Sequence, residues 1–213
     1  MSARAAPIRL TALMTSTALL GACFSGFNSN VPATQVYMLR PTAASAPAAS
    51  PVAAGLPPAA SVQVLLPRAP AGLGTDGIAV LRSGGRLDYY RGARWAGSSP
   101  QLLQTMVIDA LRGTQRFALV EAEAGPFASD YVLSMELRDF EAEYADAGPP
   151  TVHVAVVCSF GRRSDRYPLS SFTAAGEARA EEDRMQAVVA AFEHATADAL
   201  AQMAAQLTAA APR

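Results

Sequence analysis

Two neighbouring segments of alternating apolar and polar residues constrain the fold more than any other feature of the sequence. In residues 129–144, SDYVLSMELRDFEAEY, the apolar residues from Tyr131 to Leu137 occupy every second position. The alternation then slips by one residue at Arg138-Asp139, which predicts a β-bulge. In residues 151–160, TVHVAVVCSF, apolar residues again occupy alternate positions. Together the segments predict a long antiparallel hairpin with one face in a hydrophobic core.

Shorter segments predict the other strands of this sheet. Residues 77–92 have the pattern of a second hairpin, which turns at Ser83-Gly84-Gly85. Pro168 predicts that the strand in residues 166–174 lies at an edge. The remaining strand candidates are residues 35–39, 61–67 and 116–122.

Two helices are predicted to cover the sheet. The first begins at Ser98-Ser99-Pro100, where serine and proline favour a helix start, and ends at Gly113. The second begins near Arg184 and carries a continuous apolar stripe up to Leu207. Two helices packed on one face of an antiparallel sheet bury these apolar surfaces economically, so we predict an α+β fold.

The first residues have the features of an export signal. Arg4 and Arg9 precede an apolar segment, Leu10 to Leu20, that is too short for a membrane span of about 20 residues. Leu20-Gly21-Ala22-Cys23 follows, and it resembles the lipobox of bacterial lipoproteins. The resemblance implies cleavage before Cys23 and three acyl chains on it, such as palmitate, which give firm anchoring. An ordinary signal peptide with a chance cysteine is the alternative.

The predicted boundaries follow from this signal. Residues 1–22 are a lipoprotein signal peptide, 23–60 a lipidated tether with a short strand and an Ala/Pro-rich linker, and 61–213 the α+β domain. The linker has five prolines between positions 41 and 60 and few large apolar residues, so it lacks a core of its own. Because lipid uses Cys23, we interpret Cys158 as a small buried apolar residue without a disulfide partner.

Composition and motifs argue against several functions. The formal net charge of −1 provides no basic surface for nucleic acid. GLGTDG, residues 72–77, fits G-x-G-x-x-G, but a strand-like segment follows it instead of the helix that would hold a pyrophosphate, so we predict a loop. The sequence has no Walker A motif. His153 and His194 have no cysteine or histidine at ligand spacing, so we predict no metal and no cofactor.

The serines and carboxylates form no catalytic pattern. Ser170-Ser171 lacks the context of a nucleophile elbow. Glu136, Glu141 and Glu143 alternate with apolar residues, as expected on a solvated sheet face. We therefore predict no catalytic residues and a protein that is not an enzyme.

Two groups of residues are candidate partner contacts. The turn after the long hairpin carries three arginines, Arg162, Arg163 and Arg166. They either make the turn soluble or contact a partner or a phospholipid headgroup. The strongest aromatic group is Tyr89, Tyr90 and Trp95. Core packing is the default interpretation of a lone tryptophan after a hairpin, and a partner contact is the alternative.

The order of these segments resembles the ABC-type transport auxiliary lipoproteins, the small lipoprotein partners of MCE-type lipid transport systems. The similar segments are the lipobox, Tyr37-x-Leu39, and residues 78–111, 129–144, 171–178 and 187–200. The resemblance implies a non-enzymatic component on the periplasmic face of the outer membrane that docks to the MCE protein. Phe24, where an aspartate would retain the chain, fits this location.

The resemblance leaves two points open. It does not decide whether the chain forms a homo-oligomer. An envelope assembly or structural docking module with a lipid anchor, unrelated to transport, is the competing interpretation. A lipid-anchored hydrolase is disfavoured because the sequence shows no nucleophile–base pair in a recognisable context.

Overall fold

The computed structural model describes residues 33–40, 60–122, 128–145, 148–165 and 167–210. The chain divides into two units, Met1–Ala33 and Thr34–Arg213, and the second holds every strand and helix of the described residues. The elements in chain order are β1 (Gln35–Tyr37), β2 (Ser61–Val64), β3 (Gly77–Arg82), β4 (Arg86–Trp95), α1 (Ser99–Gly113), β5 (Leu119–Glu121), β6 (Tyr131–Tyr144), β7 (Thr151–Arg162), β8 (Ser170–Arg179) and α2 (Met185–Ala210). The predicted signal peptide, Cys23 and the linker residues 41–59 lie outside the described residues.

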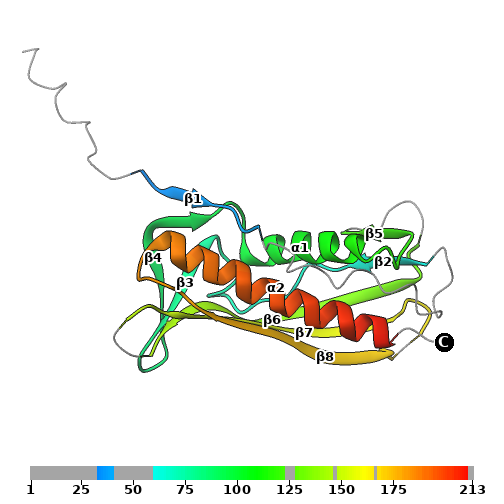
Figure 1. Cartoon of the computed structure of the whole chain (residues 1–213). Helices are drawn as coiled ribbons and strands as arrows, with labels where there is room; N and C mark the ends of the chain where they lie inside the picture. Colours follow the sequence, from blue (N-terminus) through cyan, green and yellow to red (C-terminus); the bar gives the residue numbers. More distant parts are fainter. Residues whose placement is uncertain (1–32, 41–59, 123–127, 146–147, 166, 211–213) are drawn as a thin grey trace, which may run out of the picture. The chain divides into compact units, whose positions relative to one another are not determined.

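Strand β6 is the centre of an eight-stranded sheet (Figure 1). Along one edge, β7 pairs with it in antiparallel fashion, and β8 pairs with β7. Along the other edge, β2 pairs with the beginning of β6 and β3 with its end, both parallel to it. Strand β5 extends the β2 side, and β4 followed by β1 extends the β3 side. The sheet therefore divides into two branches along one edge of β6.

The sheet is mixed, so the prediction of an antiparallel sheet is only partly right. The β6–β7–β8 meander and the β3–β4 hairpin are antiparallel, whereas four other pairings are parallel: β1–β4, β2–β5, β2–β6 and β3–β6. Alternation of apolar and polar residues identifies a strand and its buried face. The pattern is the same whether the neighbouring strand runs parallel or antiparallel. The α+β class and the two helices are as predicted.

The bulge and the tight turn occur where the sequence indicates them. The β6–β7 register shifts between Leu137 and Asp139, so Arg138 is the extra residue. Leu137 and Phe140 on either side of it are both buried in the core. In the β3–β4 turn, Gly84 and Gly85 have φ of 80° and 74°, values that favour glycine. Strand β8 pairs only with β7 among the described strands, as the edge prediction requires.

Both helices lie on one face of the sheet and enclose the core (Figure 1). Strand β7 contributes alternate residues from Val152 to Phe160, all at most 1% exposed. The backbone of α2 closely approaches β8 at Gly176, where an added Cβ would lie 1.9 Å from the carbonyl oxygen of Ala195. The glycine is therefore required by the closeness of the helix. Neither helix of the described residues is long and apolar enough to cross a membrane.

Candidate functional site

The turn between β7 and β8 presents an exposed aromatic residue in addition to the predicted Arg162. Tyr167 is 82% exposed, and Leu169 is also exposed. Arg162 is exposed at the end of β7, whereas Arg166 lies outside the described residues. An exposed tyrosine beside arginines has the composition of an interface hot spot. The arginines were predicted from the sequence but Tyr167 was not, because the exposure of an isolated tyrosine in a turn cannot be inferred from a residue pattern.

Arg163 has a structural role in this turn. Its backbone N–H donates to the carbonyl of Asp130 at 2.9 Å, and its guanidinium donates to the carbonyl of Ser129 at 3.1 Å. The guanidinium also donates to the side-chain oxygen of Gln63 on β2. These bonds fix the turn against the beginning of β6. Arg163 therefore positions the surface on which Arg162 and Tyr167 are exposed.

The aromatic group does not form one exposed surface. Trp95 is 1% exposed and packs against Phe140 and Phe192, with ring centroids 6.1 and 5.1 Å away. The default interpretation of core packing is confirmed, and the indole is not available to a partner in this fold. Its predicted role as a partner contact is withdrawn because the ring lies between the sheet and α2.

The two tyrosines of this group also have internal partners. The hydroxyls of Tyr90 and Tyr144 are 3.0 Å apart, and Tyr144 donates to Asp183 at 2.5 Å. Burial, followed by these hydroxyl contacts, raises the pKa of Tyr90 well above its ordinary value. Tyr89 is about half exposed and donates from its hydroxyl to the carbonyl of Gly72 at 2.8 Å. Of the three predicted aromatics, only Tyr89 remains on the surface.

The glycine-rich segment is a loop, as predicted, and its glycines accommodate side chains of β4. A Cβ on Gly72 would lie 2.4 Å from Cδ2 of Leu87, and one on Gly77 would lie 2.5 Å from the ring of Tyr89. Residues 77–82 continue as β3 rather than as a helix. The glycines therefore serve packing of the β3–β4 hairpin, and no helix N-terminus is available for a phosphate here.

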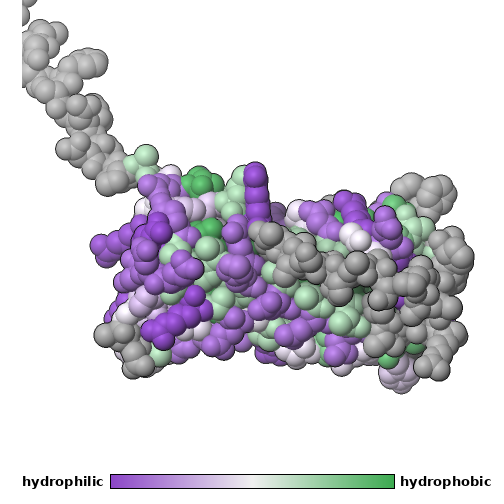
Figure 2. Space-filling model, viewed as in Figure 1, coloured by the Kyte–Doolittle hydropathy of each residue, from purple (hydrophilic) through white to green (hydrophobic). Residues whose placement is uncertain are grey.

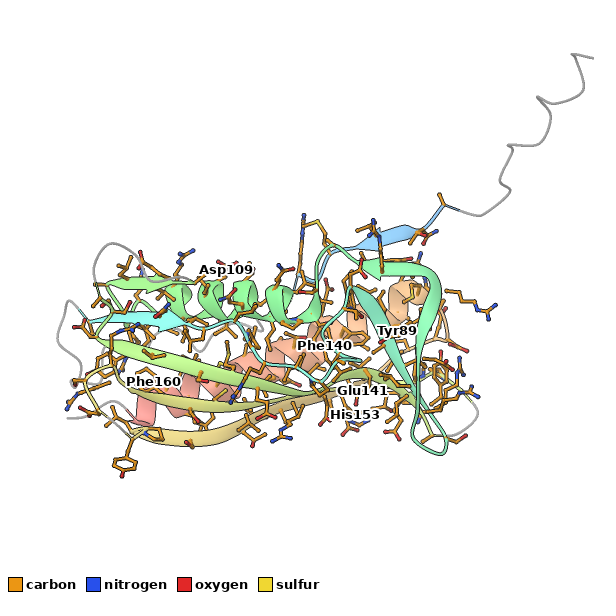
Figure 3. The ribbon with its side chains drawn as sticks, turned by 180° about the vertical axis from the view of Figure 1, so that it is seen from behind. Tyr89, Asp109, Phe140, Glu141, His153 and Phe160 are labelled. Atoms are coloured by element: carbon orange, nitrogen blue, oxygen red, sulfur yellow. The ribbon has the colours of Figure 1, made fainter. Side chains whose placement is uncertain are left out.

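The two predicted contact regions lie at opposite ends of β6. Arg162 is paired with Tyr131 at the beginning of the strand. Tyr89 lies opposite Ala79, which is paired with Glu141 near the end of the strand. Ten residues of extended chain separate these positions by about 33 Å. Figure 3 shows the same separation, with Phe160 near one end and Tyr89 near the other. One partner surface cannot include both regions without spanning the domain.

A group of ionisable residues lies on the face of the sheet opposite the helices. Nε2 of His153 is 3.2 Å from a carboxylate oxygen of Glu143, and Nδ1 is 3.6 Å from one of Glu177. Glu141 is the cross-strand neighbour of His153 (Figure 3). His153 thus connects β6, β7 and β8 on this face. His194 is exposed on α2, as predicted.

Glu141 is the exception to the predicted solvated face, because it is only 8% exposed. Its carboxylate turns back to accept a hydrogen bond from the N–H of Phe140 at 2.5 Å. Burial, the largest cause, and the neighbouring charge of Asp139 raise the pKa of Glu141 to about 7, against the opposing effect of that hydrogen bond. The prediction was wrong here because alternation gives the face of a side chain but not its exposure.

The chemistry available to these groups is limited. A hollow of about 530 Å³ beside β8 is lined by carboxylates, His153, a glutamine and small residues, with no hydroxyl, thiol or amine in its described lining. Within the described residues, no group of histidine, cysteine and acidic side chains is arranged to hold a metal ion. The hydroxyl of Ser171 is 3.2 Å from that of Ser159, a contact that supplies no base. Cys158 is buried, and burial raises the pKa of its thiol to about 12.

These observations define an α+β domain with candidate contact residues at one end of its longest strands. The chain belongs to the ABC-type transport auxiliary lipoprotein component family, whose model matches residues 37–204. The family resemblance predicted from the sequence is thereby confirmed.

Solved structures show the same fold. The DUF330-family protein XCC0632 from Xanthomonas campestris aligns with a TM-score of 0.69 and 24% sequence identity, over 83% of this chain and 96% of that one. An uncharacterized protein aligns with a TM-score of 0.57 and 15% identity, over 83% and 97% of the two chains. At these identities the likeness concerns the fold alone. A comparison with curated proteins gave no match.

Proposed function

We propose that the chain is a non-enzymatic docking component of an MCE-type lipid transport system. In this proposal the lipidated Cys23 holds it on the periplasmic face of the outer membrane, and the β7–β8 turn engages the MCE protein. Membership of the transport auxiliary family supports the general role. The observation that carries the docking site is the exposed ring of Tyr167 in the turn that also bears Arg162.

The turn is suited to docking because its backbone is held in place while Tyr167 and Arg162 stay exposed. Arg163 fixes the turn through Gln63 and Ser129, so little conformational freedom of the backbone is lost on binding. Tyrosine adds a large contact area with few rotatable bonds. A ring of this kind beside an arginine gives both apolar contact and charge-assisted hydrogen bonds to a partner.

The docking test is a pull-down of the domain without lipid against the periplasmic part of an MCE protein from the same genome. Tyr167→Ala should weaken the association by about tenfold or more, and Arg162→Glu should weaken it further in the double variant. Arg86→Glu, at the β3–β4 turn, is a matched control that should leave binding unchanged. Arg163→Glu is unsuitable as a test because it would also disturb the turn.

Two outcomes would contradict this proposal. One is a failure of the unaltered domain to bind the MCE protein while circular dichroism shows it to be folded. The other is hydrolysis of an ester or glycan by the purified domain, which would make it an enzyme. Binding that survives Tyr167→Ala would keep the partner but reject this turn as the docking site.

The anchor is tested separately by Cys23→Ser. The variant should remain as an uncleaved precursor or become soluble, with the folded domain unchanged in melting temperature. Membrane fractionation and mass spectrometry of the mature N-terminus measure this. A mature N-terminus at another residue, or an unmodified Cys23 in the wild type, would contradict lipid anchoring.

A further inference from the structure

Strand β1 is firmly attached to the domain although it is short. It pairs in parallel with residues 93–95 of β4, and Ala96 donates a hydrogen bond to the carbonyl of Tyr37 at 2.8 Å. Leu39 is buried, and the N–H of Arg40 donates to a carboxylate oxygen of Glu193 on α2 at 3.0 Å. Among the described strands only β4 pairs with β1, which is therefore the last strand of its branch.

One side of this strand is apolar and exposed. Val36 and Met38 alternate along it and are 53% and 58% exposed. A guanidinium nitrogen of Arg40 lies 3.8 Å from the sulfur of Met38. Figure 2 shows hydrophobic side chains gathered along β1 at the upper edge, beside a strongly hydrophilic one. Two apolar side chains beside a cation match the interfacial zone of a membrane, where apolar groups insert and arginine reaches the headgroups.

The position of β1 in the chain indicates what binds to this surface. Cys23 and Ala33 are ten residues apart (33 − 23), so the connecting chain spans at most about 35 Å. We propose that the exposed side of β1 lies on the membrane surface, with Val36 and Met38 among the lipid headgroups and Arg40 in contact with anionic lipid. This inference rests on the proposed lipid anchor at Cys23.

A lipid surface fits this side better than a protein partner does. Two half-exposed side chains offer far less area than the roughly 800 Å² that each partner contributes to a standard protein interface. The same two side chains suffice for a contact with lipid, because the acyl chains already hold the domain at the membrane. The anchor supplies the binding energy, and β1 only sets the orientation of the domain.

The contact would give the domain a defined orientation. Strand β1 pairs with residues 93–95 of β4, which lie beside Gly77 at the beginning of β3, and Ala79 is paired with Glu141 of β6. The β7–β8 turn lies at the other end of β6, where Arg162 is paired with Tyr131. The ten residues from Tyr131 to Glu141 span about 33 Å. With β1 on the membrane, the turn bearing Tyr167 is therefore displaced from the contact by about this distance.

The experiment uses the full lipidated protein in vesicles of phosphatidylethanolamine and phosphatidylglycerol. A polarity-sensitive fluorophore is attached to Met38→Cys, and its quenching by nitroxide-labelled lipid is measured. Cys158 does not interfere because it is buried. Gln35→Cys is the matched control on the other side of the same strand, and Tyr167→Cys is the control at the far end.

We expect blue-shifted emission and quenching at position 38, weaker quenching at 35, and none at 167. Val36→Glu should abolish the quenching at position 38. Equal quenching at 38 and 167, or none at 38, would overturn the proposed orientation. Shielding at both 38 and 35 that depends on protein concentration and not on lipid would assign the strand to a second copy of the chain instead.

The two proposals fail in different ways. Sedimentation of the unlabelled wild-type protein with vesicles reports the anchor, whereas quenching reports the orientation. Protein that remains in the supernatant contradicts the lipid anchor itself. Protein that sediments without quenching at position 38 keeps the anchor and contradicts only the contact of β1 with the membrane.

Discussion

The two faces of strand β7 have the same backbone but different environments. On the helix side, alternate residues from Val152 to Phe160 are at most 1% exposed. On the other side, Thr151, Ala155, Val157 and Ser159 are only partly buried and no helix covers them within the described residues. Neighbouring residues of β7 share the same strand geometry. Differences in reactivity or stability between the two faces are therefore due to burial under the helices and not to local conformation.

Thiol reactivity should show the largest difference between the faces. Burial raises the pKa of Cys158 from 9.0 to about 12, which lowers its thiolate population about a thousandfold. In a domain carrying Cys23→Ser, native Cys158 should therefore react with a thiol reagent about a thousandfold more slowly than in the denatured chain. Ser159→Cys, combined with Cys158→Ala, should react rapidly in the native state. Rapid labelling of native Cys158 would contradict the burial of this face.

A substitution at Gly176 measures how closely α2 packs against the sheet. Gly176→Ala places a Cβ against the backbone of Ala195, so α2 must shift, and we expect a loss of about 3 kcal/mol in the free energy of unfolding. Ala175→Val, next to it on the exposed side of β8, should change stability by less than about 0.5 kcal/mol. Urea denaturation measures both variants. A loss below about 0.5 kcal/mol for Gly176→Ala would refute the close approach.

A pair of valines compares the faces by the same substitution. Val156 is fully buried under the helices, and Val156→Ala should lower the free energy of unfolding by about 2 kcal/mol. Val157→Ala removes the same methyl groups from the other face, where the side chain is partly exposed, and should cost less than about 1 kcal/mol. Equal losses in urea denaturation would mean that a further element covers the second face.

Glu141 is expected to lower the stability of the fold as the pH rises, whereas most carboxylates raise it. Its pKa is raised from 4.5 to about 7, so the folded state holds a proton that the unfolded chain releases above pH 4.5. Stability from this group is therefore present below about pH 4.5 and is lost as the pH rises to about 7. Glu141→Gln should be about 1–2 kcal/mol more stable than wild type at pH 8, and equal to it at pH 4.

The control for this prediction is Glu136→Gln on the same face. Glu136 is more exposed and pairs with Arg138 at 3.3 Å, so its replacement should change stability by less than about 0.5 kcal/mol at either pH. A Glu141→Gln variant that is less stable than wild type at pH 8 would show that the carboxylate is charged and favourably bound in the folded state.

Local features of the fold could be predicted from the sequence because they depend on neighbouring residues. The β6–β7 hairpin, the bulge at Arg138 and the limits of α1 all follow from alternation, turn residues and capping. The parallel partners of β2 and β3 could not be predicted in this way. Both strands pair with β6 across more than 50 positions of chain, and their own residue patterns do not indicate which strand they pair with.

The candidate site was less accessible to sequence reasoning. The arginine turn was identified from charge, and core packing was the default interpretation of Trp95, but the partial burial of Tyr90 was not predicted. Trp95 packs against Phe192 of α2, about 100 positions away in the chain, and the hydroxyl of Tyr90 contacts that of Tyr144, 54 positions away. Three other side chains are exposed because no element of the described residues packs over them: Tyr167, Val36 and Met38. A local residue pattern does not show which side chains the rest of the fold leaves uncovered.

The bulge at Arg138 is a place where β6 can change its length by one residue. Arg138 is the extra residue, and the paired residues on either side of it keep the register of a regular strand, with Leu137 opposite Val156 and Phe140 opposite Val154. Deletion of Arg138 would therefore leave Phe140 and Ala142 on the same side of β6 as Leu137. An insertion of one residue at a paired position, without a new bulge, would instead turn the apolar residues on one side of it away from the helices. Single-residue changes in length are therefore accommodated at the bulge and in the connections between strands, and not among the paired residues of β6.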